Sequence, residues 1–193
     1  MPKKIQMPKN VLVAAAVATA VLLAAGCGGS SDSSSSDTSP TATWADGLCS
    51  ALNTWKSSLT ETVNTVKDGS LSKDSLTTAV DDAKSATETL TSDLEGLGKP
   101  DTEAGQQAKD SIDQLSTDLK ADMTKIEDAV DGASGDSGIQ SAVSVVTSTL
   151  VTMGTQVTST ITDVKGVDAK GELTSAFDQS ESCQELQGSL QGS

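Results

Sequence analysis

The chain has 193 residues, with 13 lysines plus arginines against 27 aspartates plus glutamates, and a formal net charge of −14 at pH 7. All 13 basic residues are lysines, and the sequence has no histidine and no tyrosine. Such an acidic balance disfavours nucleic acid as a partner. Because arginine and histidine are missing, the usual phosphate-binding forks, proton shuttles and imidazole ligands are missing too, so we expect no enzyme, no metal site and no cofactor.

The first 26 residues are organised as an export signal. Lys3, Lys4 and Lys9 precede residues 11–23, which are apolar or small except for Thr19. A run of 13 such residues is too short to span a bilayer as a stable helix and is typical of the apolar region of a signal peptide. Residues 1–26 are therefore predicted to direct export.

The apolar run ends in Leu-Leu-Ala-Ala-Gly-Cys at 22–27, which resembles the lipobox of bacterial lipoproteins. Ala24 stands where this motif favours a large aliphatic residue. The resemblance implies cleavage before Cys27, lipidation of that cysteine, and anchoring in the cell membrane at its extracytoplasmic face. The alternative is an ordinary secretory signal cut after Ala-Thr-Ala at 18–20, which would leave Cys27 as a free thiol.

The mature chain is predicted to consist of a tether and one domain. Residues 27–43 begin with Cys27 and are rich in Ser, Thr, Gly and Asp, which is typical of a flexible linker. We expect the folded domain to span 44–190 and a disordered tail to span 191–193. Removal of the signal leaves 10 lysines against 27 acidic residues, a formal charge of −17.

Apolar residues of the domain recur every three or four positions, the spacing of one helix face, in four long segments. These segments are 44–66, 76–97, 108–130 and 139–164, and a shorter amphipathic piece begins near Ala169 and carries Leu173, Phe177, Cys183 and Leu186. Short turns between helices favour antiparallel neighbours. The predicted fold is all-α, an up-and-down four-helix bundle with a short fifth helix at the C-terminus.

The fourth segment differs from the others because residues 139–162 carry no charge. Its Val, Ile and Thr content would allow strands, but the helical step persists over 26 residues, which is too long for an ordinary strand. Ser-Gly-Ile-Gln at 137–140 is interpreted as a capping box. Extra apolar residues at Ala142, Val145 and Val151 widen the apolar face, so we expect this helix to be the most buried.

Several residue groups suggest chemistry but have a simpler interpretation. Gly-Asp-Ser-Gly at 135–138 matches the nucleophile motif of trypsin-like proteases, yet no histidine can activate Ser137, and Asp136 or Ser137 is expected to cap a helix. The turn at 131–136 lacks the alternating ligands of a calcium loop. Paired acids are expected on solvated helix faces and the two tryptophans in the core: Asp118 with Asp122, Asp110 with Asp113, Asp178 with Glu181 and Glu185, and Trp44 with Trp55.

The sequence contains three cysteines, an odd number for an exported protein. Lipidation of Cys27 leaves Cys49 and Cys183 as a pair outside the reducing cytoplasm, so we predict a disulfide between them. Cys49 lies near the start of the first helix, whereas Cys183 lies far into the last segment. Because bridged Cα atoms must lie within about 7 Å, the fifth helix must cross the bundle end or bend.

A Ser/Thr-rich tether, the sequence Trp-Ala-Asp-Gly-Leu-Cys-Ser-Ala at 44–51, Trp55 and a second cysteine near the end together resemble the small secreted helical lipoproteins of actinobacteria. That group has no assigned activity, so the resemblance implies architecture and location only. We expect a non-enzymatic binding or scaffold module that contacts an envelope protein or polymer. The alternative is a carrier whose fourth helix lines a cavity of several hundred Å³ for an apolar ligand.

Overall fold

The computed structural model describes residues 39–68 and 72–191. The predicted signal, the lipidation site at Cys27 and most of the predicted linker lie outside these residues. The described part is helical and contains no strand, which confirms the all-α class. Its helices are α1 (Pro40–Asp68), α2 (Lys73–Leu97), α3 (Gly105–Asp131), α4 (Gly135–Gly166), α5 (Glu172–Gln179) and α6 (Glu181–Gln191).

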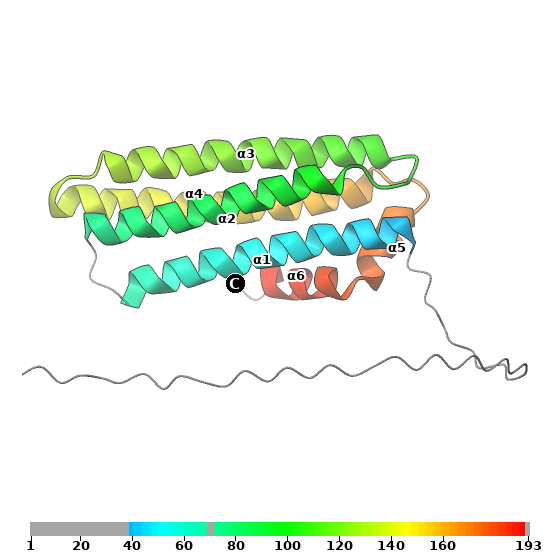
Figure 1. Cartoon of the computed structure of the whole chain (residues 1–193), viewed down its shortest axis with the longest axis horizontal. Helices are drawn as coiled ribbons and strands as arrows, with labels where there is room; N and C mark the ends of the chain where they lie inside the picture. Colours follow the sequence, from blue (N-terminus) through cyan, green and yellow to red (C-terminus); the bar gives the residue numbers. More distant parts are fainter. Residues whose placement is uncertain (1–38, 69–71, 192–193) are drawn as a thin grey trace, which may run out of the picture. The chain divides into compact units, whose positions relative to one another are not determined.

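The four long helices form the predicted up-and-down bundle (Figure 1). α1 packs against α2, α2 against α3, and α3 against α4, while the short helices α5 and α6 pack against α1. The first and last long helices, α1 and α4, are not among these closely packed pairs. No helix in the described ranges is both long and apolar enough to cross a membrane.

The apolar stripes predicted for α2 and α3 are buried in the core of the bundle. Burying a large aliphatic side chain stabilises a fold by about 1.5–3 kcal/mol relative to leaving it exposed, so these two stripes account for much of the packing energy. The buried members are Leu76, Val80, Ala83, Thr87, Leu90 and Leu94 of α2, and Ala108, Ile112, Leu115, Leu119, Met123, Ile126 and Val130 of α3.

Helix α1 begins at Pro40, four residues before the expected start of the domain. The Ser39 hydroxyl oxygen accepts a hydrogen bond from the Ala42 backbone N–H at 3.1 Å, as a helix cap does. Proline is favoured at the first helical position because its missing N–H would have no partner there. Residues 40–43 therefore belong to the bundle, and assigning them to the linker was wrong.

Helix α4 departs from its prediction at its start and in its burial. It begins at Gly135 with Ser134 in the cap position, so the capping box at 137–140 and a cap at Asp136 or Ser137 were wrong. It is also not the most buried helix, because Val151 is 67% exposed and Val145 38% exposed. α3 covers one side of α4, and no closely packed helix covers the side that faces α1.

The C-terminal segment forms two helices where one was expected. The chain leaves the helical conformation at Ser180, whose ψ is 124°, and α6 begins at the next residue. The Ser180 hydroxyl accepts a hydrogen bond from the Cys183 N–H at 3.2 Å and donates one to an Asp46 carboxylate oxygen at 2.9 Å. Ser180 thus caps α6 and ties the break to α1.

Candidate functional site

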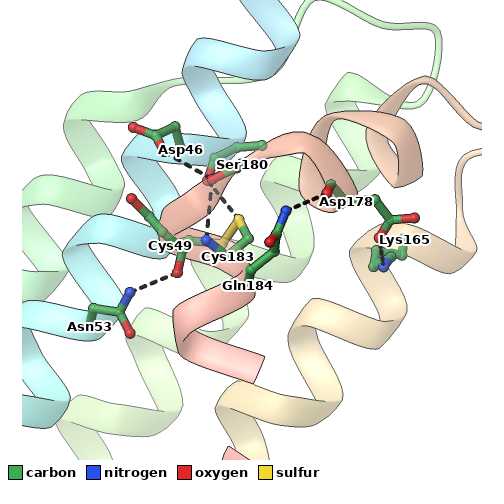
Figure 2. The surroundings of a disulfide bond; sticks show 10 residues. Asp46, Cys49, Asn53, Lys165, Asp178, Ser180, Cys183 and Gln184 are labelled. Atoms are coloured by element: carbon green, nitrogen blue, oxygen red, sulfur yellow. Dashed lines mark hydrogen bonds and ion pairs between the residues drawn. A yellow bond between two sulfur atoms is a disulfide. The ribbon is translucent and has the colours of Figure 1, made fainter. Parts of the chain in front are cut away.

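The predicted disulfide between Cys49 of α1 and Cys183 of α6 is present, with the two Cα atoms 4.9 Å apart (Figure 2). The break at Ser180 supplies the bend that this pairing required, because it lets α6 turn away from α5 and lie along α1. Both half-cystines are buried. The prediction of this pair from cysteine count and expected location is therefore confirmed.

Polar contacts hold α6 against the same face of α1 on either side of the disulfide. The Asn53 side-chain amide donates a hydrogen bond to the Ser182 carbonyl at 2.7 Å (Figure 2). One helical turn further along α1, the Lys56 ammonium donates to the carbonyl of Ser189. With the Ser180–Asp46 bond, these contacts fix α6 along α1 from Asp46 as far as Lys56.

The acidic residues expected on solvated faces occupy such faces with one exception. Asp122 is buried, with a side chain only 2% exposed. Its carboxylate accepts hydrogen bonds from the Lys125 ammonium at 2.6 Å and from the Gln156 amide of α4 at 2.9 Å. Asp122 therefore joins α3 to α4, and the interpretation of this residue as solvated was wrong.

The protease-like motif at 135–138 forms the first turn of α4. Ser137 lies exposed in the first turn of α4, and its backbone carbonyl accepts a hydrogen bond from the Ser141 hydroxyl at 3.0 Å. Within residues 39–68 and 72–191, no three His, Cys, Asp or Glu side chains gather closely enough to hold a metal ion.

The two tryptophans lie in the core, as predicted. Trp44 packs edge-on against Phe177 of α5 with ring centroids 6.3 Å apart, and its indole N–H donates to the Gly98 carbonyl. The Trp55 indole N–H donates to the Thr87 hydroxyl of α2 at 3.0 Å. Each indole thus has a hydrogen-bond partner inside the bundle, and the buried Trp55 also borders a neighbouring space.

That space is a groove between α1 and α4, with a volume of about 800 Å³. It lies where the two helices fail to pack closely, and we call it the α1–α4 groove. Its lining comprises Leu52, Trp55, Lys56, Leu59, Thr60, Val63 and Asn64 of α1, Thr147, Leu150, Val151, Gly154, Thr155, Val157 and Thr158 of α4, and Leu186 of α6.

The walls of the α1–α4 groove are more apolar in character than their threonines suggest. Each of the four threonine hydroxyls donates a hydrogen bond to a backbone carbonyl of its own helix, so it does not need a ligand as acceptor. These bonds run from Thr60 to Lys56, Thr147 to Val143, Thr155 to Val151 and Thr158 to Gly154, at 2.8–3.0 Å. Lys56 is the only charged residue of the lining.

Two other hollows lie between α1 and α2, and their linings are different. One, of about 430 Å³, is bordered by Glu61 and Asp82 with several hydroxyl side chains. The other, of about 490 Å³, is bordered mainly by Gly, Ser and Thr residues with Asp93. Among these hollows, only the α1–α4 groove combines a large volume with a continuous apolar wall.

Comparison of the chain with known protein families, with curated proteins and with solved structures gives no match. The sequence signal for the α1–α4 groove was the fourth segment, which carries no charge at 139–162 and has extra apolar residues beside its main stripe.

Proposed function

We propose that this protein is a membrane-anchored extracytoplasmic lipoprotein whose helical domain binds an apolar ligand in the α1–α4 groove and catalyses no reaction. The groove itself carries the proposal. Its volume of about 800 Å³ falls within the ~300–1,000 Å³ typical of small-molecule sites, and side chains of two facing helices line it. Of the functions that the sequence suggested, a carrier is the one that requires such a space.

The chemistry of the lining favours an apolar ligand over a polar one. The groove is lined by the apolar side chains of Leu59, Val63, Leu150 and Val151. Val151 is largely exposed, because no closely packed helix covers it. Each Å² of apolar surface removed from water contributes about 25 cal/mol, so a ligand that covers these side chains gains binding energy without any new hydrogen bond.

The proposed location rests on the sequence and on the disulfide. The lipobox-like sequence before Cys27 supplies the anchor, and disulfides persist mainly outside the reducing cytoplasm. The Cys49–Cys183 bond agrees with a protein that folds after export.

A second candidate is a scaffold that contacts an envelope protein or polymer. Val151 favours it, because an exposed valine that lines a groove between two helices can also receive an amphipathic helix of a partner. The two candidates differ in ligand size, since a small apolar molecule should fill the groove only in the first case.

Filling the α1–α4 groove from within tests the proposal. A Cβ built on Gly154 meets no atom within 4 Å, and Gly154 lines the groove, so Gly154→Leu adds a larger side chain to the groove wall. Gly96 of α2 is equally open but lies outside the groove, so Gly96→Leu is the matched control. Both replacements favour helix, by up to about 1 kcal/mol, and should leave the fold intact.

The full chain carrying Cys27→Ser, which has no lipid of its own, is delipidated and titrated with 1-dodecanol by displacement of a neutral fluorescent probe. We expect binding to the parent chain and to Gly96→Leu, and a loss of at least tenfold in Gly154→Leu. If dodecanol does not bind the parent chain, or binds Gly154→Leu equally well, the proposed function is wrong.

A further inference from the structure

We propose that the ligand of the α1–α4 groove is a single acyl chain with an anionic headgroup, and that the headgroup binds the Lys56 ammonium. This inference rests on the proposed function and names the ligand class. The tail is held by the apolar walls of α1 and α4, and the charge of the headgroup decides between amphiphiles of equal length.

The distribution of charge around the groove carries the first step. The chain has 27 acidic residues, yet none of those within residues 39–68 and 72–191 lines the groove, whose single charge is the positive charge of Lys56. Close to the groove, the nearest charge is this ammonium, which attracts an anion and repels a cation. An amphiphile with a carboxylate or phosphate head matches this arrangement.

Lys56 is also held in place and has hydrogen-bonding capacity left. Its ammonium donates to the Ser189 carbonyl near the end of α6, which fixes the charge at the edge of the groove. A lysine ammonium has three donors, so two remain for a headgroup. None of the ion pairs among residues 39–68 and 72–191 involves Lys56, so no carboxylate of these residues competes with a headgroup for its ammonium.

The direction of the tail follows from the extent of α6. α6 lies along α1 only as far as Lys56, and the groove continues beyond it past Leu59 and Val63 to Asn64. At 1.5 Å per residue, Lys56 and Asn64 are about 12 Å apart along α1. A tail that starts at Lys56 therefore runs along the uncovered part of the groove, between Leu59 and Val63 on one side and α4 on the other.

The headgroup is tested with three amphiphiles of the same length: dodecanoate, 1-dodecanol and dodecylammonium. The protein is the delipidated full chain carrying Cys27→Ser, and binding is measured by calorimetry at low concentrations, below micelle formation. We expect dodecanoate to bind at least tenfold more tightly than dodecanol and dodecylammonium to bind most weakly, because a hydrogen bond to a charged group has at least that effect. Higher salt should weaken dodecanoate alone.

Variants at Lys56 assign the effect to this side chain. Lys56→Met should lower dodecanoate affinity about tenfold and leave dodecanol unchanged, whereas Lys56→Arg should keep most of the preference. Lys99→Met removes a lysine outside the groove and should change nothing. Peptide mapping of the Cys49–Cys183 bond and thermal unfolding show whether each variant is folded. If Lys56→Met does not fold, the comparison of Lys56→Arg with the parent chain still tests the role of the positive charge.

The length of the tail gives a second readout. Each added methylene should increase affinity about fourfold until the tail outgrows the groove, after which affinity should level off. Measuring carboxylates of about 8 to 16 carbons covers both the rise in affinity with tail length and the length at which affinity levels off.

The outcomes separate the inference from the proposed function. If no amphiphile binds, the proposed function fails. Three results would leave the groove as an apolar site but contradict the proposed anionic headgroup. Dodecanol would bind as tightly as dodecanoate, dodecylammonium would bind most tightly of the three, or Lys56→Met would still prefer dodecanoate over dodecanol. If sedimentation shows a dimer that Gly154→Leu abolishes, the occupant is a second copy of the chain and the inference is overturned.

Discussion

At the scale of single residues, Asp122 shows how a charge is accommodated inside the bundle. Its carboxylate is buried between α3 and α4, with one oxygen bound by Lys125 and the other by Gln156. A buried carboxylate without partners is strongly unfavourable, so both contacts are needed to keep it there. Because Gln156 belongs to α4, this contact also sets how α4 is rotated against α3, and therefore which of its faces is left for the groove.

Replacing Asp122 with alanine should lower the free energy of unfolding by about 2 kcal/mol, because the Gln156 amide loses its acceptor in a buried position. Asp113→Ala is the matched control. Asp113 forms an exposed pair with Lys109 one turn away on the same helix, and such pairs contribute less than about 0.5 kcal/mol. Urea unfolding of both variants measures the difference. Equal losses in the two variants would show that Asp122 has no special structural role.

At the scale of helices, the disulfide decides whether the C-terminal element stays on the bundle. The bond joins residues 134 positions apart, so it closes nearly the whole domain into one loop. In the chain-entropy model, a loop of this size stabilises the folded state by about 5 kcal/mol. That value is comparable to the lower end of the total stability of a domain, ~5–15 kcal/mol.

Cys49→Ala combined with Cys183→Ala should therefore lower the free energy of unfolding by about 5 kcal/mol, and a reducing agent should do the same to the parent chain. Hydrogen exchange should show α6 losing protection first. Without the disulfide, α6 is held mainly by the hydrogen bonds from Asn53 and Lys56 and by the buried side chain of Leu186. The agent should not affect the double variant. Unchanged stability and unchanged protection of α6 would contradict the role given to this bond.

The helices themselves were largely predictable, because apolar spacing reports directly which residues share a face. The stripes of α2 and α3 lie in the core as their spacing indicated. The pair Ser39-Pro40 is a common signal for the start of a helix, a capping serine followed by proline at the first helical position. It was missed because the preceding residues have the composition of a linker. Asp122 had a signal too, since it falls three residues after Leu119 and four before Ile126, within the buried stripe of α3.

What spacing does not report is how many neighbours cover a face. The width of the apolar face of α4 suggested deep burial, but the same pattern suits a wall that a neighbouring helix leaves open, as at Val151. The break at Ser180 was also not predictable from local sequence, since no glycine or proline marks it. It depends on contacts with residues far away in the chain, namely Asp46 and Cys49.

At the scale of the whole molecule, anchoring and binding are proposed to act together. A lipid on Cys27 would keep the domain near the membrane, where single acyl chains are available, while its acidic surface is repelled by anionic headgroups. A groove with one cation would then distinguish a single anionic amphiphile from the bilayer surface itself.

The anchor is tested separately from the groove. We expect the native chain to incorporate labelled fatty acid and to fractionate with membranes, and Cys27→Ser to lose both properties, because no other residue is proposed to carry lipid. Cys49→Ser is the control, since it removes a thiol without removing the lipidation site. A wild-type chain without label would contradict the proposed anchor.

Photochemical mapping tests most directly whether the α1–α4 groove holds an acyl chain. A dodecanoate analogue with a diazirine near the end of its tail is bound to the full chain carrying Cys27→Ser, irradiated, and located by peptide sequencing. We predict crosslinks within residues 59–64 of α1 and 147–158 of α4, and their loss in Gly154→Leu but not in Gly96→Leu. Crosslinks spread over α2 and α3, or unchanged in Gly154→Leu, would contradict the account.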